Sequence, residues 1–105
     1  MNTENTNSVF PVYIALGTNL GDRLANLQAA IQMLSPAVDV VDQSPVYQTP
    51  PWGYEYQPDF LNQVIFAKTN LKPVDLLNFL KQIEIKVGRT PTFQYGPRVV
   101  DLDIL

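Results

Sequence analysis

The stretch VVDLDIL, residues 99–105, decides the fold, because it supplies the strand that completes the order of elements along the chain. Its apolar residues alternate with Asp101 and Asp103, and successive side chains of a β-strand point to opposite faces. One face of this strand is therefore predicted to be apolar, and the other to carry both acids. Acidic residues at these positions indicate either a face exposed to solvent or a functional site that the strand carries.

Three earlier stretches predict further strands. Residues 11–17, PVYIALG, form a short apolar run that ends in glycine, as expected for a central strand. Residues 38–48 are rich in β-branched residues and are interrupted by Pro45, which favours an edge strand with a break. Residues 60–69, FLNQVIFAKT, alternate as a strand does.

Two stretches have the spacing of amphipathic helices. The first helix is expected to be capped by Asp22 and to run to about Leu34, where the Ser35-Pro36 pair stops it. The second is expected to begin at Pro73 and to end at Gly88, which supplies a left-handed stop. The apolar stripes predicted for these helices are Leu24, Leu27, Ile31 and Leu34 in the first, and Leu76, Leu80, Ile83 and Val87 in the second.

The predicted order is strand, helix, strand, strand, helix, strand. Its usual solution is an α+β fold, the ferredoxin-like βαββαβ unit, in which an antiparallel sheet carries two helices on one face. We expect one such domain over residues 11–105, preceded by a disordered N-terminal tail over residues 1–10. The other face of the sheet is left uncovered, so its side chains are informative about function.

The composition is that of a soluble globular protein with one core: 105 residues, 46% hydrophobic, with a net charge of −3. The absence of cysteine and histidine excludes disulfides, the usual zinc sites and a Ser/His or Cys/His nucleophile. We expect no nucleic-acid partner, because such surfaces need clustered cations. We also expect no membrane span or signal peptide, and hence a cytoplasmic protein.

Asp101 and Asp103 are candidate metal ligands. Two residues along a strand separate their Cβ atoms by roughly 6–7 Å, so both carboxylates can reach one ion or bracket two. Oxygen ligands suit Mg²⁺, which commonly takes one or two carboxylates together with substrate phosphates. The alternative is a solvated acidic face, and the spacing alone leaves that alternative open.

Phe60 and Asn62 share one face of the third strand, where a ring can stack and an amide can recognise a flat heterocycle. Phe60 alone is equally well explained as core, whereas asparagine is depleted in strands and needs partners when buried. Glu84 lies in the last turn of the second helix, where the helix dipole disfavours a negative charge. Basic residues gather around this helix end, as a solvated rim or as a polyphosphate-binding cluster: Lys81, Lys86, Arg89 and Arg98.

Several motifs together resemble the family of 6-hydroxymethyl-7,8-dihydropterin pyrophosphokinase, a transferase of the folate pathway that moves pyrophosphate from ATP to a pterin. These motifs are ALGTNLGD, VYQTPPWG, QPDFLNQV, E-x-x-x-GR and GPRVVDLDIL. The match runs from about Val12 to Leu105 and covers about the first two thirds of the family's usual length. The resemblance implies a magnesium-dependent kinase with a pterin substrate and with ATP as co-substrate.

The resemblance also implies roles for individual residues. Asp101 and Asp103 resemble the pair that holds two Mg²⁺ ions, and Arg89 and Arg98 resemble catalytic cations. Glu84, Arg89 and Arg98 match positions around ATP. The implied pterin-binding residues are the loop residues Thr49, Pro50, Pro51 and Trp52, the stacking residue Phe60 and the ring-reading residue Asn62, while Gly17, Thr18 and Asn19 match the family's first turn.

This sequence departs from the family pattern in two ways. Gln94-Tyr95 stands where many members have Arg-Trp, and the family continues past the di-acid strand with nucleotide contacts and a second stacking aromatic. We therefore expect weak activity or none from this shortened chain. The alternative function is that of a non-catalytic ferredoxin-like interaction domain that pairs through its open sheet face. Such a face is expected to expose an apolar patch and to allow a homo-oligomer.

Overall fold

The computed structural model describes residues 8–88 and 97–105. The predicted disordered tail falls largely on residues 1–7, outside the described residues, and the first strand begins one residue earlier than expected. The elements in chain order are β1 (Phe10–Thr18), α1 (Arg23–Leu34), β2 (Val38–Gln43), β3 (Tyr47–Thr49), β4 (Phe60–Thr69), α2 (Pro73–Val87) and β5 (Asp101–Ile104).

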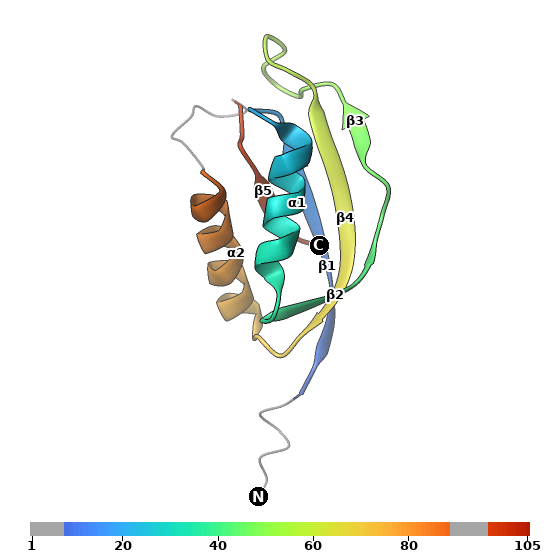
Figure 1. The fold of residues 1–105 in the computed structure, drawn as a ribbon, viewed down its shortest axis with the longest axis vertical. Coiled ribbons are helices and arrows are strands. Elements are labelled where there is room, and N and C mark those ends of the chain that lie inside the picture. The colour runs from blue at the N-terminus through green and yellow to red at the C-terminus, as the bar shows by residue number, and fades with distance from the viewer. Residues whose placement is uncertain (1–7, 89–96) are drawn as a thin grey trace, which may run out of the picture.

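The strands form one antiparallel sheet in the order β2-β4-β1-β5, with β3 also paired to β4. β2 and β3 occupy the same edge, so the edge strand broken near Pro45 is confirmed. Helix α1 packs on β1, β2 and β4, and α2 packs on α1 and β5. Both helices lie on one side of the sheet (Figure 1), which confirms the ferredoxin-like α+β prediction.

The core lies between the sheet and the two helices. β1 and β4 direct alternate residues such as Ile14 and Ile65 into it, because a strand's side chains change face at every residue. Burying such a side chain contributes about 1.5–3 kcal/mol. The buried hydrophobic residues are Ile14, Leu16, Leu27, Ala30, Leu34, Val38, Ile65, Ala67, Leu76, Leu80, Ile83, Val100 and Leu102.

Both predicted helices are confirmed, with one error in the first stripe. Asp22 caps α1, since its Oδ1 accepts from the backbone N–H of Ala25 at 3.1 Å. Gly88 ends α2 in the left-handed conformation with φ of 118°. Leu24, however, is 50% exposed. The buried stripe is centred on Leu27 and Leu34, and Leu24 falls at its margin in the first turn.

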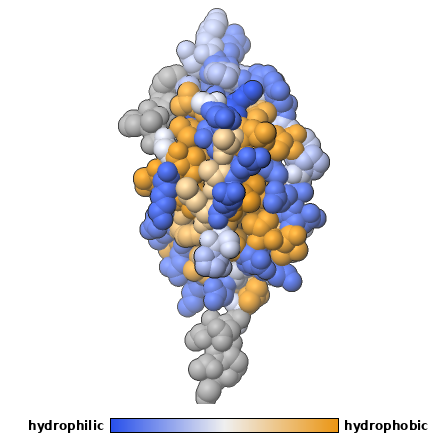
Figure 2. Space-filling view, in the orientation of Figure 1, coloured by the Kyte–Doolittle hydropathy of each residue, from blue (hydrophilic) through white to orange (hydrophobic). Residues whose placement is uncertain are grey.

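The opposite face of the sheet has no helix over it in the part of the chain that the structure describes. It carries aromatic as well as polar residues, including Tyr13 and Phe66, whose ring centroids lie 5.0 Å apart. Figure 2 shows the other side of the molecule, the helix side seen in Figure 1, where hydrophobic and hydrophilic residues are interspersed. None of the described helices combines the length and apolarity that crossing a membrane requires.

Candidate functional site

The site begins with a row of three residues across the open face of the sheet. Gly17 of β1 pairs with Asn62 of β4 on one side and with Asp101 of β5 on the other. Residues directly opposite each other on adjacent strands point to the same face. The register therefore brings an amide and a carboxylate from distant parts of the sequence to either side of a glycine.

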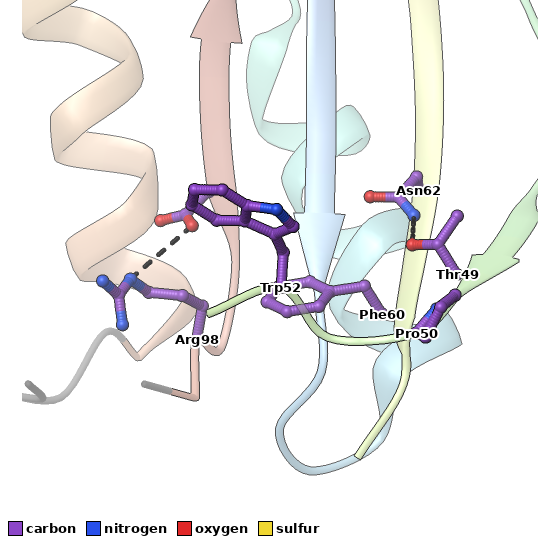
Figure 3. Close-up of a pocket in the computed structure, with 7 residues that line it drawn as sticks. Thr49, Pro50, Trp52, Phe60, Asn62 and Arg98 are labelled. Atoms are coloured by element: carbon purple, nitrogen blue, oxygen red, sulfur yellow. Dashed lines mark hydrogen bonds and ion pairs between the residues drawn. The ribbon is translucent and has the colours of Figure 1, made fainter. Parts of the chain in front are cut away.

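Gly17 forms an open floor between these side chains. A Cβ atom at this position would lie 3.3 Å from Asn62 Oδ1 and 3.7 Å from Phe60 Cδ1. The side chains of Asn62, Phe60 and Asp101 around this glycine border a cavity of about 320 Å³, although Gly17 itself is not among the lining residues. The residues that line this cavity, drawn in Figure 3, are Thr49, Pro50, Trp52, Phe60, Asn62, Arg98 and Asp101.

The amide of Asn62 is held in one orientation. Its Nδ2 donates to Thr49 Oγ1 at 2.6 Å. Its Oδ1 consequently lies toward Gly17, 3.3 Å from the position that a Cβ atom there would take. The cavity thus presents an aimed hydrogen-bond acceptor, and a ligand with an N–H donor in its ring plane would satisfy it.

We predict that Gly17→Ala will weaken binding of a flat ring in this cavity by about tenfold, since a methyl group enters the floor and one tenfold step corresponds to ~1.4 kcal/mol. The backbone of Gly17 tolerates alanine because it lies in a strand without positive φ, so any loss of stability should come from the 3.3 Å contact between the new methyl group and Asn62 Oδ1. Equilibrium titration of the variant measures the affinity for the ring, and thermal unfolding measures its stability. Unchanged ring binding would contradict the role of Gly17 as a floor.

Two aromatic residues line the same cavity. Phe60, the first residue of β4, is half-buried, and Trp52 of the preceding loop is 74% exposed. Figure 3 shows the two rings between Arg98 on one side and the Asn62–Thr49 pair on the other. Flat aromatic walls favour flat ligands, because stacking adds about 0.5–1.5 kcal/mol per aromatic pair beyond burial.

The predicted acidic pair lies on the same sheet face. Asp101 lines the cavity, and its Oδ2 is 3.6 Å from Arg98 Nε. Asp103 follows on the same face, opposite Ala15, and is exposed outside the cavity lining. The described residues contain no cluster of three or more acidic, histidine or cysteine ligands. Two carboxylates fit Mg²⁺ when substrate phosphates and water complete its shell.

Asn19 joins the segments that frame the cavity, whereas its position in the sequence predicted only a turn. It is 1% exposed, and its Nδ2 donates to Gln57 Oε1 at 2.8 Å and to the carbonyl of Pro58 at 3.0 Å. Its Oδ1 accepts from the backbone N–H of Arg98 at 2.7 Å, and its own N–H donates to the Arg98 carbonyl at 3.0 Å. One buried side chain therefore ties the β1–α1 turn to both the 50–59 loop and the segment before β5.

Further hydrogen bonds fix the 50–59 loop at its C-terminal end. Arg23 Nη1 donates to the carbonyl of Asp59 at 2.9 Å, and Gln48 Nε2 donates to Asp59 Oδ2 at 3.0 Å. Gln57 Nε2 donates to the carbonyl of Tyr54 at 2.6 Å. The loop that carries Trp52 is thus anchored to α1 and β3, which its composition alone does not indicate.

The structure brings most of the predicted site residues together. Pro51 belongs to the same loop but does not line the cavity. Glu84 lies on the helix side of the sheet with 1% exposure, so it does not line the cavity either. Arg89, predicted to contact ATP and to act in catalysis, lies outside the described residues, as does the Gln94-Tyr95 pair. Gln57 was absent from the predicted site, and Gly17 and Asn19 were matched only to the family's first turn.

The fold and the site define a class: a ferredoxin-like α+β domain with a ligand cavity on its open sheet face, where aromatic walls, an oriented amide and a carboxylate meet. Comparison with known proteins specifies the family. Residues 13–105 match the family described as 7,8-dihydro-6-hydroxymethylpterin-pyrophosphokinase (HPPK). The chain belongs to this family, as its motifs predicted.

Individual relatives agree with this assignment. The chain is 48% identical over 95 residues to the 2-amino-4-hydroxy-6-hydroxymethyldihydropteridine pyrophosphokinase of Bacillus subtilis, covering 89% of this chain and 57% of the relative. The protein of the same name from Aquifex aeolicus is 45% identical, with 90% and 59% covered. The mitochondrial folate synthesis bifunctional protein of Pisum sativum is 44% identical, with 90% and 18% covered. The chain spans less than two thirds of each of these relatives.

Proposed function

We propose that this chain takes part in the transfer of pyrophosphate from ATP to 6-hydroxymethyl-7,8-dihydropterin in folate biosynthesis. The observation that carries the proposal is the row formed by Asn62, Gly17 and Asp101, which sets an aimed acceptor and a carboxylate on either side of one open floor. Membership of the pyrophosphokinase family supports it.

Each part of the cavity has a place in this reaction. Phe60 and Trp52 provide aromatic surface for the pterin ring, and Asn62 Oδ1 accepts a hydrogen bond from the ring edge. Thr49 keeps that amide from turning over. The ring is thereby oriented with its hydroxymethyl group toward the acidic side of the cavity, and positioning of this kind accounts for much of the catalysis in phosphoryl transfer.

Asp101 and Asp103 would hold Mg²⁺, two ions in the full proposal, beside the phosphates of ATP. Bound there, the metal would neutralise phosphate charge and align the phosphate chain with its acceptor. Arg98 contributes a second positive charge at the same edge, since its guanidinium already lies 3.6 Å from Asp101. Arg89 remains a proposed ATP contact, whereas Glu84 is buried on the helix side of the sheet and contacts the backbone of β5 instead. Weak activity of the chain itself remains a prediction.

The test of the pterin site is Asn62→Ala. We expect this change to weaken binding of 6-hydroxymethylpterin by about tenfold or more, because it removes the oriented acceptor, and a lost hydrogen bond is worth roughly 0.5–1.5 kcal/mol or more when its partner stays buried. Isothermal titration measures the affinity. Asn70→Ala, at an exposed asparagine beyond the other end of β4, is the matched control. Equal affinities of the two variants would refute the proposed pterin site.

We also propose that the open face permits self-association, because it exposes aromatic side chains such as Tyr13 at 54% and Tyr47 at 51%. Sedimentation velocity should show a mass that rises with concentration, and Tyr13→Ser should reduce that rise. A monomer of constant mass at every concentration would rule out this self-association.

A cytoplasmic location is also part of the proposed function, since the substrates are small polar molecules.

A further inference from the structure

Glu84 makes a contact that the proposed reaction does not use. It lies on α2 with 1% exposure, and its Oε2 accepts a hydrogen bond from the backbone N–H of Leu102 at 2.9 Å. Its Oε1 is 3.6 Å from Lys81 Nζ, whose side chain is half-exposed. A buried carboxylate thus reaches from the second helix to the middle of the last strand.

This contact supplies a hydrogen bond that the sheet cannot. β5 has four residues and pairs with β1 alone among the described strands, so its other edge has no neighbouring strand. Leu102 is 1% exposed, so water does not reach its backbone N–H either. An unsatisfied buried N–H costs about 1–3 kcal/mol, and Glu84 removes that cost.

A carboxylate is a costly means to this end if the end is only core packing. Removing an ionised group from water carries a penalty of several kcal/mol, and the half-exposed Lys81 alone is too well solvated to offset it. The carboxylate does, however, hold one point of β5 rigidly. That point is Leu102, and the residues on either side of it are Asp101 and Asp103.

We infer that Glu84 is a positioning residue for the acidic pair: it anchors β5 at Leu102 and so fixes the lateral position of Asp101 and Asp103 on the opposite face. The inference rests on the proposed function, in which these two acids hold the metal. Second-layer contacts of this kind matter because displacements of about 1 Å at a reacting centre lower rates strongly. Loss of such a contact typically lowers metal affinity by about 10–100-fold.

Three variants of the full chain separate anchoring from other effects. Glu84→Ala removes the acceptor, Glu84→Gln keeps an acceptor oxygen without the charge, and Thr69→Val removes a buried hydroxyl that bonds the Ala37 carbonyl at the far end of the sheet. Mn²⁺, a paramagnetic probe for the Mg²⁺ site, is titrated by electron paramagnetic resonance. We expect Glu84→Ala to lower Mn²⁺ affinity about tenfold or more, and the other two to stay close to the unmodified protein.

Three results of the titration would overturn the inference. They are unchanged affinity in Glu84→Ala, an equal loss in Glu84→Gln, which would assign the effect to charge, and an equal loss in Thr69→Val, which would assign it to general destabilisation. If the unmodified chain binds no Mn²⁺, the proposed metal site fails, and amide NMR spectra then decide the inference. The amides of Asp101 and Asp103 should shift in Glu84→Ala and stay in place in Glu84→Gln; unshifted amides in Glu84→Ala would overturn it.

Discussion

Replacing Asp101 with asparagine is expected to weaken Mg²⁺-dependent ATP binding by about ten- to 100-fold, because a charge-assisted contact is worth roughly 1.5–3 kcal/mol. Asp101 is the stronger candidate for a metal ligand of the two acids, since it lines the cavity whereas Asp103 is exposed and does not line it. Asp103→Asn should act in the same direction with a smaller effect. Isothermal titration with a non-hydrolysable ATP analogue measures both.

The difference in ATP affinity between Asp101→Asn and the unmodified chain should depend on magnesium, and this dependence is an internal control. Chelation of the metal should remove the gap between Asp101→Asn and the unmodified chain, because the carboxylate then has no ion to hold. Asp39→Asn, at an exposed acid on β2 at the other edge of the sheet, should bind the nucleotide like the unmodified chain. If Asp101→Asn binds the analogue normally in Mg²⁺, the acids belong to a solvated face and the metal site is refuted.

Asn19→Ala is expected to lower the free energy of unfolding by about 2–3 kcal/mol, because it leaves a part-buried Arg98 N–H without its acceptor and releases Gln57 and Pro58. In a domain of this size that loss corresponds to a Tm lower by roughly 10–20 °C. Thermal unfolding followed by circular dichroism checks it. Asn78→Ala, at an exposed position of α2, should leave Tm unchanged or raise it, since alanine favours helix.

Asn19→Asp tests the direction of these hydrogen bonds. An aspartate keeps an acceptor for the Arg98 N–H but sets a carboxylate oxygen against the Gln57 and Pro58 acceptors. We expect the 50–59 loop to exchange its amides faster while the Arg98 amide stays protected. A Tm for Asn19→Ala within about 2 °C of the unmodified chain would contradict this role of Asn19, since that shift amounts to well under 1 kcal/mol.

The sequence predicted the fold well because its signals are local. Alternation in residues 60–69, the cap at Asp22 and the stop at Gly88 each depend on a few neighbouring residues, and each is confirmed. Leu24 was misplaced because helical spacing gives the direction of a side chain but not how far the buried stripe extends along the helix. Glu84 was noted as unfavourable for its helix, yet its partner on β5 could not be read from α2 alone.

The candidate site was predictable only in part, because the signals in the sequence are local and the site is assembled from distant segments. Alternation placed Asp101 with Asp103, and Phe60 with Asn62, on common faces, but the register that brings the two pairs to either side of Gly17 is a property of three strands together. The contacts of Asn19 span up to 79 residues of sequence and have no local signature. Before the structure, only the family resemblance indicated that these two pairs of residues belong to one site.

The central claim is that a pterin and the phosphates of ATP meet over Gly17, between Asn62 and Asp101. A two-dimensional amide NMR titration with 6-hydroxymethylpterin, Mg²⁺ and a non-hydrolysable ATP analogue tests it most directly. The account predicts shifts at Gly17, Asn62 and Asp101, with the Asn62 shift following the pterin and the Asp101 shift requiring both metal and nucleotide. Shifts confined to the apolar surface around Phe10 and Leu105 at the far end of the sheet, or absent altogether, would contradict it.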